Sequence, residues 1–165
     1  MWRIKKHFQN YSSQQKVAKF LLETGLKVKD GKIYCNEILM SPVRISRVLD
    51  VDRRTVNATI KTIQENEELY NIYSNLKTTA FFGEVAREID AGLIEIIPTS
   101  AEEPGIIAGV TQILADLDVI VRQCITREIE FHEKAKIFIT TDTSVPMEAV
   151  ERIKEIKGVK SVTIY

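Results

Sequence analysis

The feature of this sequence that most restricts its fold is the alternation of strand-like and helix-like segments after residue 92. Apolar side chains recur at period two in some segments and at three- and four-residue spacing in others. The expected elements are a strand at 93–98, a helix at 106–117, a strand at 119–129, a strand at 136–140, a helix opened by Pro146 and ended by Gly158, and a strand at 159–165. This order predicts an antiparallel sheet with both helices on one face.

Strand–helix–strand–strand–helix–strand is the order of a ferredoxin-like βαββαβ unit. We therefore expect an α+β protein whose residues 92–165 form that unit. The architecture supports many functions, so it does not indicate one alone.

Charge is divided sharply along the chain. Residues 1–64 hold 13 Lys or Arg against 5 Asp or Glu, a balance of +8, and residues 65–165 hold 10 against 18, a balance of −8. This division indicates a module that faces a polyanion, joined to a part with another task. An uneven distribution of surface charge without function is the alternative.

The basic part has the pattern of a mainly helical domain with a hairpin. The expected elements are a helix from Ser12 or Ser13 that ends at Gly25, a hairpin that turns at Asp30-Gly31, a helix over 43–49 and a second helix over 53–64. Pro42 and Asp52 suit the starts of the last two helices. Small Ser46 and the apolar residues after it match the spacing of a helix-turn-helix. Asp50 stands where many such turns have Gly, and Asp tolerates left-handed backbone better than most residues.

The second of these helices carries a polar face suited to DNA. Its exposed set is Arg53, Arg54, Asn57 and Lys61. Arg bonds guanine edges, Asn bonds adenine edges, and Lys neutralises phosphate. We expect these four residues to bind DNA; a solvated basic face is the alternative. The hairpin precedes the helix pair, whereas the wing of a winged helix usually follows it.

Residues 65–91 are expected to form a helical connection between the two domains, 1–64 and 92–165. An apolar stripe from Leu69 to Leu76 argues against a flexible linker. Such a helix suits mechanical coupling or pairing with a second chain. Packing against the C-terminal domain is the alternative.

The segment Glu103-Pro104-Gly105-Ile106-Ile107-Ala108-Gly109 resembles the ACT domain family of small-molecule sensors. Pro104 fixes a turn, and Gly105 lets a ligand approach the backbone. Free N–H groups and the helix dipole there favour a carboxylate. Glu102 stands where that family commonly has Asp, and Gly158-Val159-Lys160-Ser161-Val162 also looks like the end of such a domain.

The resemblance implies dimers that bind amino acids between subunits. The residues that it marks are Ser100, Glu102, Gly105 and Ile106 in the loop, with Gln123 on the second strand as a weaker candidate. Glu102 suits an α-amino group. A tight Pro-Gly turn with no ligand is the alternative.

Together the two parts resemble a group of predicted archaeal regulators of amino-acid metabolism, with an N-terminal helix-turn-helix region and a C-terminal ACT domain. The resemblance implies an amino-acid-responsive transcriptional regulator that acts as a homodimer or higher homo-oligomer. The alternatives are a sensor that acts on an enzyme or an RNA without binding DNA, and a purely structural dimer.

Catalysis has little support in the sequence. His7 and His132 are isolated, Cys124 reads as a buried small residue, and no phosphate-binding loop or dinucleotide fingerprint is present. We expect no enzyme activity, no metal and no cofactor. No apolar run reaches membrane-spanning length, the N-terminus lacks the pattern of a secretory signal, and Cys35 lies far from Cys124, so we expect a cytoplasmic protein with no membrane partner and free thiols.

Overall fold

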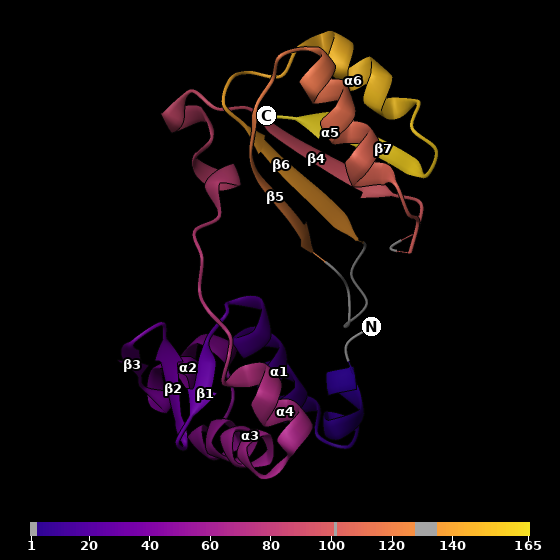
Figure 1. Ribbon diagram of the computed structural model, residues 1–165. Coiled ribbons are helices and arrows are strands. Elements are labelled where there is room, and N and C mark those ends of the chain that lie inside the picture. The colour runs from indigo at the N-terminus through magenta and orange to yellow at the C-terminus, as the bar shows by residue number, and fades with distance from the viewer. Residues whose placement is uncertain (1–2, 101, 128–134) are drawn as a thin grey trace. The chain divides into compact units, whose positions relative to one another are not determined.

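The computed structural model describes residues 3–100, 102–127 and 135–165. The chain divides between residues 80 and 81 into two compact units (Figure 1). Each unit has a buried apolar core of its own.

The N-terminal unit combines helices with a small antiparallel sheet. Its elements are η1 (Arg3–Phe8), α1 (Ser12–Glu23), β1 (Lys27–Lys29), β2 (Lys32–Cys35), β3 (Ile38–Met40), α2 (Pro42–Leu49), α3 (Arg53–Glu65) and α4 (Glu67–Tyr73). The sheet has the order β1-β2-β3. Asp30 and Gly31 both have positive φ, +49° and +71°, which is the type I′ turn expected for a two-residue hairpin.

Strand β3 is absent from the sequence-based expectation. It has three residues, and two of them, Ile38 and Leu39, are 69% and 59% exposed. Adjacent side chains of a strand point to opposite faces. Because Ile38 and Leu39 are both apolar and both exposed, β3 lacks the alternation of apolar and polar residues by which a strand is recognised in a sequence.

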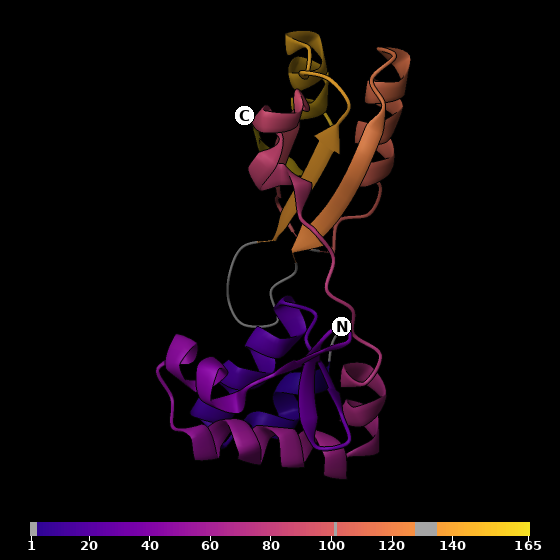
Figure 2. The ribbon, with the colours of Figure 1, turned by 90° about the vertical axis from the view of Figure 1, so that its left-hand side faces the viewer.

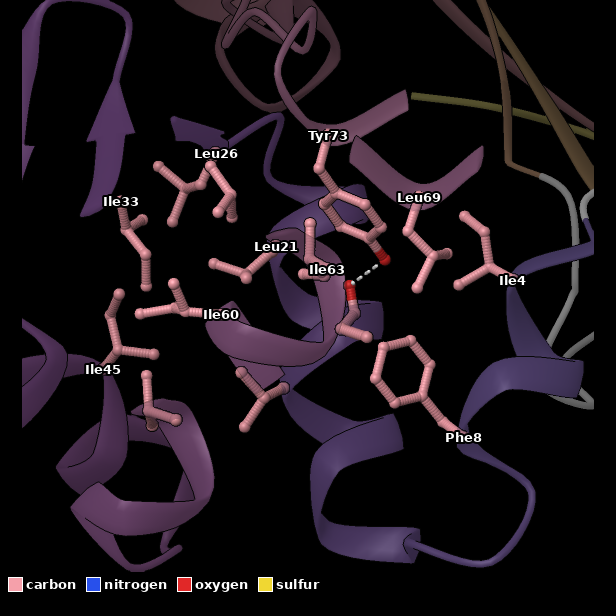
Figure 3. Packing of buried hydrophobic residues seen from close by; sticks show 14 of the residues in the cluster. Ile4, Phe8, Leu21, Leu26, Ile33, Ile45, Ile60, Ile63, Leu69 and Tyr73 are labelled. Atoms are coloured by element: carbon pink, nitrogen blue, oxygen red, sulfur yellow. Dashed lines mark hydrogen bonds between the residues drawn. The ribbon is translucent and has the colours of Figure 1, made fainter. Parts of the chain in front are cut away.

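Helix α4 belongs to the N-terminal core. Leu69 and Tyr73 are completely buried, and the Tyr73 hydroxyl donates a hydrogen bond of 3.0 Å to the Ala18 carbonyl of α1 (Figure 3). The domain boundary therefore differs from the expected one at residues 64 and 65. The apolar stripe expected in a connection over 65–91 instead packs between α1, α3 and η1, so the N-terminal unit extends to residue 80.

The C-terminal unit has the expected order of strands and helices. Its elements are η2 (Phe82–Val85), η3 (Arg87–Ile89), β4 (Leu93–Pro98), α5 (Ile106–Asp116), β5 (Val121–Arg127), β6 (Lys136–Thr141), α6 (Met147–Lys154) and β7 (Val159–Ile164). The strands form one antiparallel sheet in the order β5-β6-β4-β7. This is the ferredoxin-like arrangement, so the α+β fold class is confirmed. The end of the expected strand 119–129 and most of the turn at 130–135 lie outside the described residues.

The two faces of this sheet are covered differently. Ile94, Ile96 and Ile139 pack under α5 and α6 in the main core. On the other face Phe138 packs against Phe81, with the ring centroids 5.3 Å apart and nearly perpendicular. The segment before β4 thus covers part of the second face.

Helix α6 buries Ala149, Val150 and Ile153. Met147, the first residue of α6, is 64% exposed because it lies off that buried stripe. Among the described residues, none of the helices has the length and apolar character that crossing a bilayer demands.

Candidate functional site

Helices α2 and α3 are joined by a tight turn over residues 50–52. Asp50 ends α2 in the left-handed conformation, with φ of +50°, in agreement with the expected role of that residue. Asp52 begins α3, and its carboxylate accepts a hydrogen bond of 2.6 Å from the Arg54 N–H. Ser46 is buried, and its carbonyl accepts a hydrogen bond from the Val51 N–H at 3.0 Å. We call residues 42–65 the α2–α3 pair.

One side of α3 holds the pair on the core. Val56, Ile60 and Ile63 recur at helical spacing and are buried in the N-terminal core. Thr59 is buried with them, and its hydroxyl donates 2.8 Å to the Thr55 carbonyl, so its polar atom is satisfied inside the helix.

The other side of α3 is exposed and basic. It brings together the four residues that the sequence marked for DNA: Arg53, Arg54, Asn57 and Lys61. Within the described part of the chain, no hydrogen bond or ion pair engages the side chains of Arg53, Arg54 or Asn57. Lys61 lies 3.7 Å from Glu65 one turn on, an exposed pair that contributes little to stability. The polar groups of this face are therefore available to a partner.

Helix α2 adds two arginines that the sequence reasoning missed. Arg44 and Arg47 are exposed, and neither forms an ion pair or side-chain hydrogen bond with any residue that the structure describes. Their spacing of three residues on one short helix is the signal that marks them. At the end of α2, the Lys16 ammonium donates to the Leu49 carbonyl, which places a cation at the helix C-terminus.

In the C-terminal unit the structure describes the candidate ligand loop at residues 99, 100 and 102–105. The Ser100 hydroxyl accepts a hydrogen bond of 3.2 Å from the Glu102 N–H, and both side chains are exposed. Gly105 has φ of +90° and directly precedes α5, and a Cβ at this position would meet nothing within 4 Å. Glycine is favoured at position 105 because of the positive φ, and not because a side chain would lack space.

The two adjacent acids of this loop differ. Glu103 is half-buried against Gly158, and its carboxylate lies 3.7 Å from the Lys157 ammonium. The exposed Glu102 carboxylate has no hydrogen bond or ion pair to the described residues. Since the Thr99 N–H also donates a hydrogen bond of 2.8 Å to the Gly158 carbonyl, the loop is held on the residue before β7, and Glu102 is exposed.

Ile106 and Gln123 lie apart from the other loop candidates. The Ile106 side chain is 3% exposed and belongs to the core, so only its backbone faces the loop. Gln123 pairs with Thr140, which pairs with Leu93 at the start of β4, whereas the loop follows the end of that strand. The five steps from Leu93 to Pro98 correspond to about 17 Å of strand. The side-chain amide oxygen Oε1 of Gln123 also accepts a hydrogen bond of 3.0 Å from the Phe82 N–H. Within one chain the structure brings together Ser100, Glu102 and Gly105 only.

Cys124 is exposed on β5 and not buried as expected, because β5 is an edge strand of the sheet. Partial desolvation raises the pKa of its thiol, which disfavours the nucleophilic thiolate at neutral pH. Throughout the described ranges, no three His, Cys, Asp or Glu residues gather in a way that could hold a metal ion.

The chain is thus a two-unit α+β protein, with an exposed basic helix face in one unit and a braced glycine loop in a ferredoxin-like second unit. No model of a known protein family matches it, and neither does any curated protein.

Solved structures similar to this chain include ACT domains and AsnC-type regulators. The ACT domain of a GTP pyrophosphokinase from Chlorobium tepidum is 12% identical and covers 46% of this chain and 96% of its own, with a TM-score of 0.36. The aspartate kinase regulatory subunit of Thermus thermophilus is 22% identical over 47% of this chain and 51% of its own, with a TM-score of 0.37. AsnC of E. coli is 12% identical over 93% and 89%, with a TM-score of 0.24. These scores lie below 0.5, so the fold assignment rests on the strand order of the chain itself.

Proposed function

We propose that this protein is an amino-acid-responsive transcriptional regulator. The α2–α3 pair acts as a helix-turn-helix that binds DNA, and the C-terminal unit acts as an ACT-type domain that dimerises and binds a small effector. The observation that carries the proposal is the exposed face of α3, where the side chains of Arg53, Arg54 and Asn57 have no partner among the described residues.

The chemistry of that face fits a DNA duplex better than a solvated surface. A cation on a helix can pair with an acid one turn away, as Lys19 does with Glu23. Arg53 and Arg54 have no such acid one turn away on α3, and the carboxylate of Asp52 caps the helix. The N-terminal turn of α3 also offers its helix dipole to phosphate.

The effector part of the proposal rests on the loop at residues 99–105. Glu102, whose carboxylate has no hydrogen bond or ion pair to the described residues, suits an α-amino group. The N–H groups after Gly105 begin α5, and the first N–H groups of a helix have no partner within it and favour a carboxylate. An α-amino acid carries both charges.

Regulation requires that the effector bind one relative arrangement of two DNA-binding units better than another. A homodimer formed through the C-terminal unit supplies two such units. The same loop contacts Gly158, the residue before β7, through Thr99 and Glu103. An effector bound at the loop would therefore act on β7, which is an edge strand of the sheet.

The test is selection of duplexes from a random-sequence pool with the full-length protein, followed by fluorescence anisotropy with the enriched duplex. Arg53→Ala with Arg54→Ala should weaken binding by at least tenfold, because a bidentate Arg–base contact contributes about 1–3 kcal/mol. The control, Lys154→Ala with Lys160→Ala, removes the same charge from exposed positions of the other unit.

Failure to enrich any duplex, or equal affinity of the arginine variant and wild type, would overturn the DNA-binding proposal. In parallel, binding to a single-stranded RNA pool tests the alternative of an RNA partner.

A further inference from the structure

The turn of the β1–β2 hairpin lies beside the C-terminal end of α3, although 32 residues separate them in the sequence. A Cβ at Gly31 would stand 3.4 Å from Oε1 of Gln64. Strand β1 contacts both α3 and α4, and Figure 2 shows the hairpin reaching the level of α3. The hairpin precedes the α2–α3 pair in the chain, but the fold places its turn where the exposed face of α3 ends.

Gln64 continues the exposed face of α3. Steps of four, four and three residues lead from Arg53 through Asn57 and Lys61 to Gln64, so the four side chains follow one side of the helix. All four are exposed. The hairpin turn therefore prolongs the same surface.

Two lysines flank this turn. Lys29 and Lys32 are directly opposite each other in the β1–β2 register, and both are exposed. Like charges in directly opposite positions destabilise a sheet. Neither ammonium has a hydrogen bond or ion pair to the described residues, although Asp30 lies between them in the chain. By contrast, the ammonium of Lys27, two residues before Lys29 on β1, forms an ion pair with the Glu37 carboxylate at 2.8 Å.

The two ends of α3 are far enough apart to contact different parts of a DNA duplex. The eleven steps from Arg53 to Gln64 measure about 17 Å along the helix axis. The major groove of DNA is about 12 Å wide. The N-terminal residues of a recognition helix contact the base edges in a helix-turn-helix complex. With Arg53 and Asn57 in those contacts, the far end of α3 and the hairpin turn beside it would lie toward the phosphate backbone.

We propose that the β1–β2 turn is a second DNA contact, in which Lys29 and Lys32 bind backbone phosphates beside the groove that α3 enters. This inference rests on the proposed DNA-binding function and adds a separate surface to it. Phosphate contacts carry no sequence information, so the turn contributes affinity for any duplex.

The test measures binding of the full-length protein to a 30-base-pair mixed-sequence duplex by fluorescence anisotropy between about 50 and 200 mM KCl. Each lost phosphate contact lowers the slope of log K against log salt by about 0.9. The double variant Lys29→Ala, Lys32→Ala should therefore lose about 1.8 from the slope, while Lys29→Arg with Lys32→Arg should retain it. Lys154→Ala with Lys160→Ala is the charge-matched control and should leave the slope unchanged.

The outcomes separate this inference from the proposed function. An unchanged slope for the Lys29 and Lys32 variant, with a reduced affinity for the Arg53 and Arg54 variant, overturns the hairpin contact alone. An equal reduction in the charge-matched control also overturns it, because net charge then explains the effect. Absence of duplex binding by the wild type overturns both. Thermal unfolding by circular dichroism checks that each variant is folded.

Discussion

Gly105 and Gly158 form a matched pair for substitution, because both have φ of +90° and only one has a close neighbour. A Cβ at Gly105 meets nothing within 4 Å, whereas a Cβ at Gly158 would lie 2.3 Å from Cγ of Glu103. Left-handed backbone costs a non-glycine residue about 1–2 kcal/mol. Gly105→Ala should lower the free energy of unfolding of the C-terminal unit by about that amount.

Gly158→Ala should cost more, since overpacking adds about 1–3 kcal/mol to the same backbone strain. Replacing Glu103 by Ala in that variant removes the contacting atom. The double variant should therefore recover most of the difference and approach the stability of Gly105→Ala. The coupling between the two substitutions measures the packing component by itself.

The assay is urea denaturation followed by pulsed hydrogen exchange of peptides that contain β4 and β7, which reports the C-terminal unit alone. Equal destabilisation by Gly105→Ala and Gly158→Ala would refute the reasoning. So would a failure of Glu103→Ala to recover stability in the Gly158→Ala background. Either result would mean that Glu103 does not brace the loop on Gly158.

Two further predictions concern the same unit. One of the twenty amino acids, at about 100 times its Kd, should stabilise the protein by about 2.7 kcal/mol and raise Tm by several degrees. Glu102→Gln should reduce this rise in Tm, and the control Glu155→Gln should not. A screen in which no amino acid raises Tm would contradict the effector proposal. Hydrogen bonds from Gln112 and then Arg152 lower the pKa of Asp116 below 3.8, so its stabilising effect is present above that pH and disappears as pH falls through the lowered value. Asp116→Asn should therefore be less stable than wild type at pH 7, and the difference in unfolding free energy should close as the pH falls through the lowered pKa of Asp116. A difference that stays constant from neutral to strongly acidic pH would exclude ionisation as its cause.

Local chemistry made much of the fold predictable. The Asp30-Gly31 turn, the left-handed Asp50 and the Asp52 cap all follow from preferences of single residues, and each is present. The order of elements in the C-terminal unit follows equally from periodicity within short segments. The exposed face of α3 was predictable for the same reason, since one helical period decides which residues lie opposite Val56 and Ile60.

Long-range packing made the rest unpredictable. The apolar stripe of α4 shows that one side of this helix is buried, but the local sequence does not indicate against which element. The hydrogen bond from Tyr73 to Ala18 therefore could not be predicted. The exposure of Cys124 depends on β5 being an edge strand, and the distance of Gln123 from the loop depends on strand register. Both are properties of the assembled sheet. The proximity of Gly31 and Gln64 is likewise a property of the folded unit alone.

The inclusion of α4 in the N-terminal core bears on how such a protein can be reshaped by recombination. A segment that ends at residue 64 would leave behind Leu69 and Tyr73, which fill the interior between α1 and η1, and would present bare apolar surface wherever it was joined. A segment that ends near residue 80 takes its complete interior with it. A boundary for recombining the N-terminal unit with other domains therefore lies after α4, because that helix belongs to the N-terminal core.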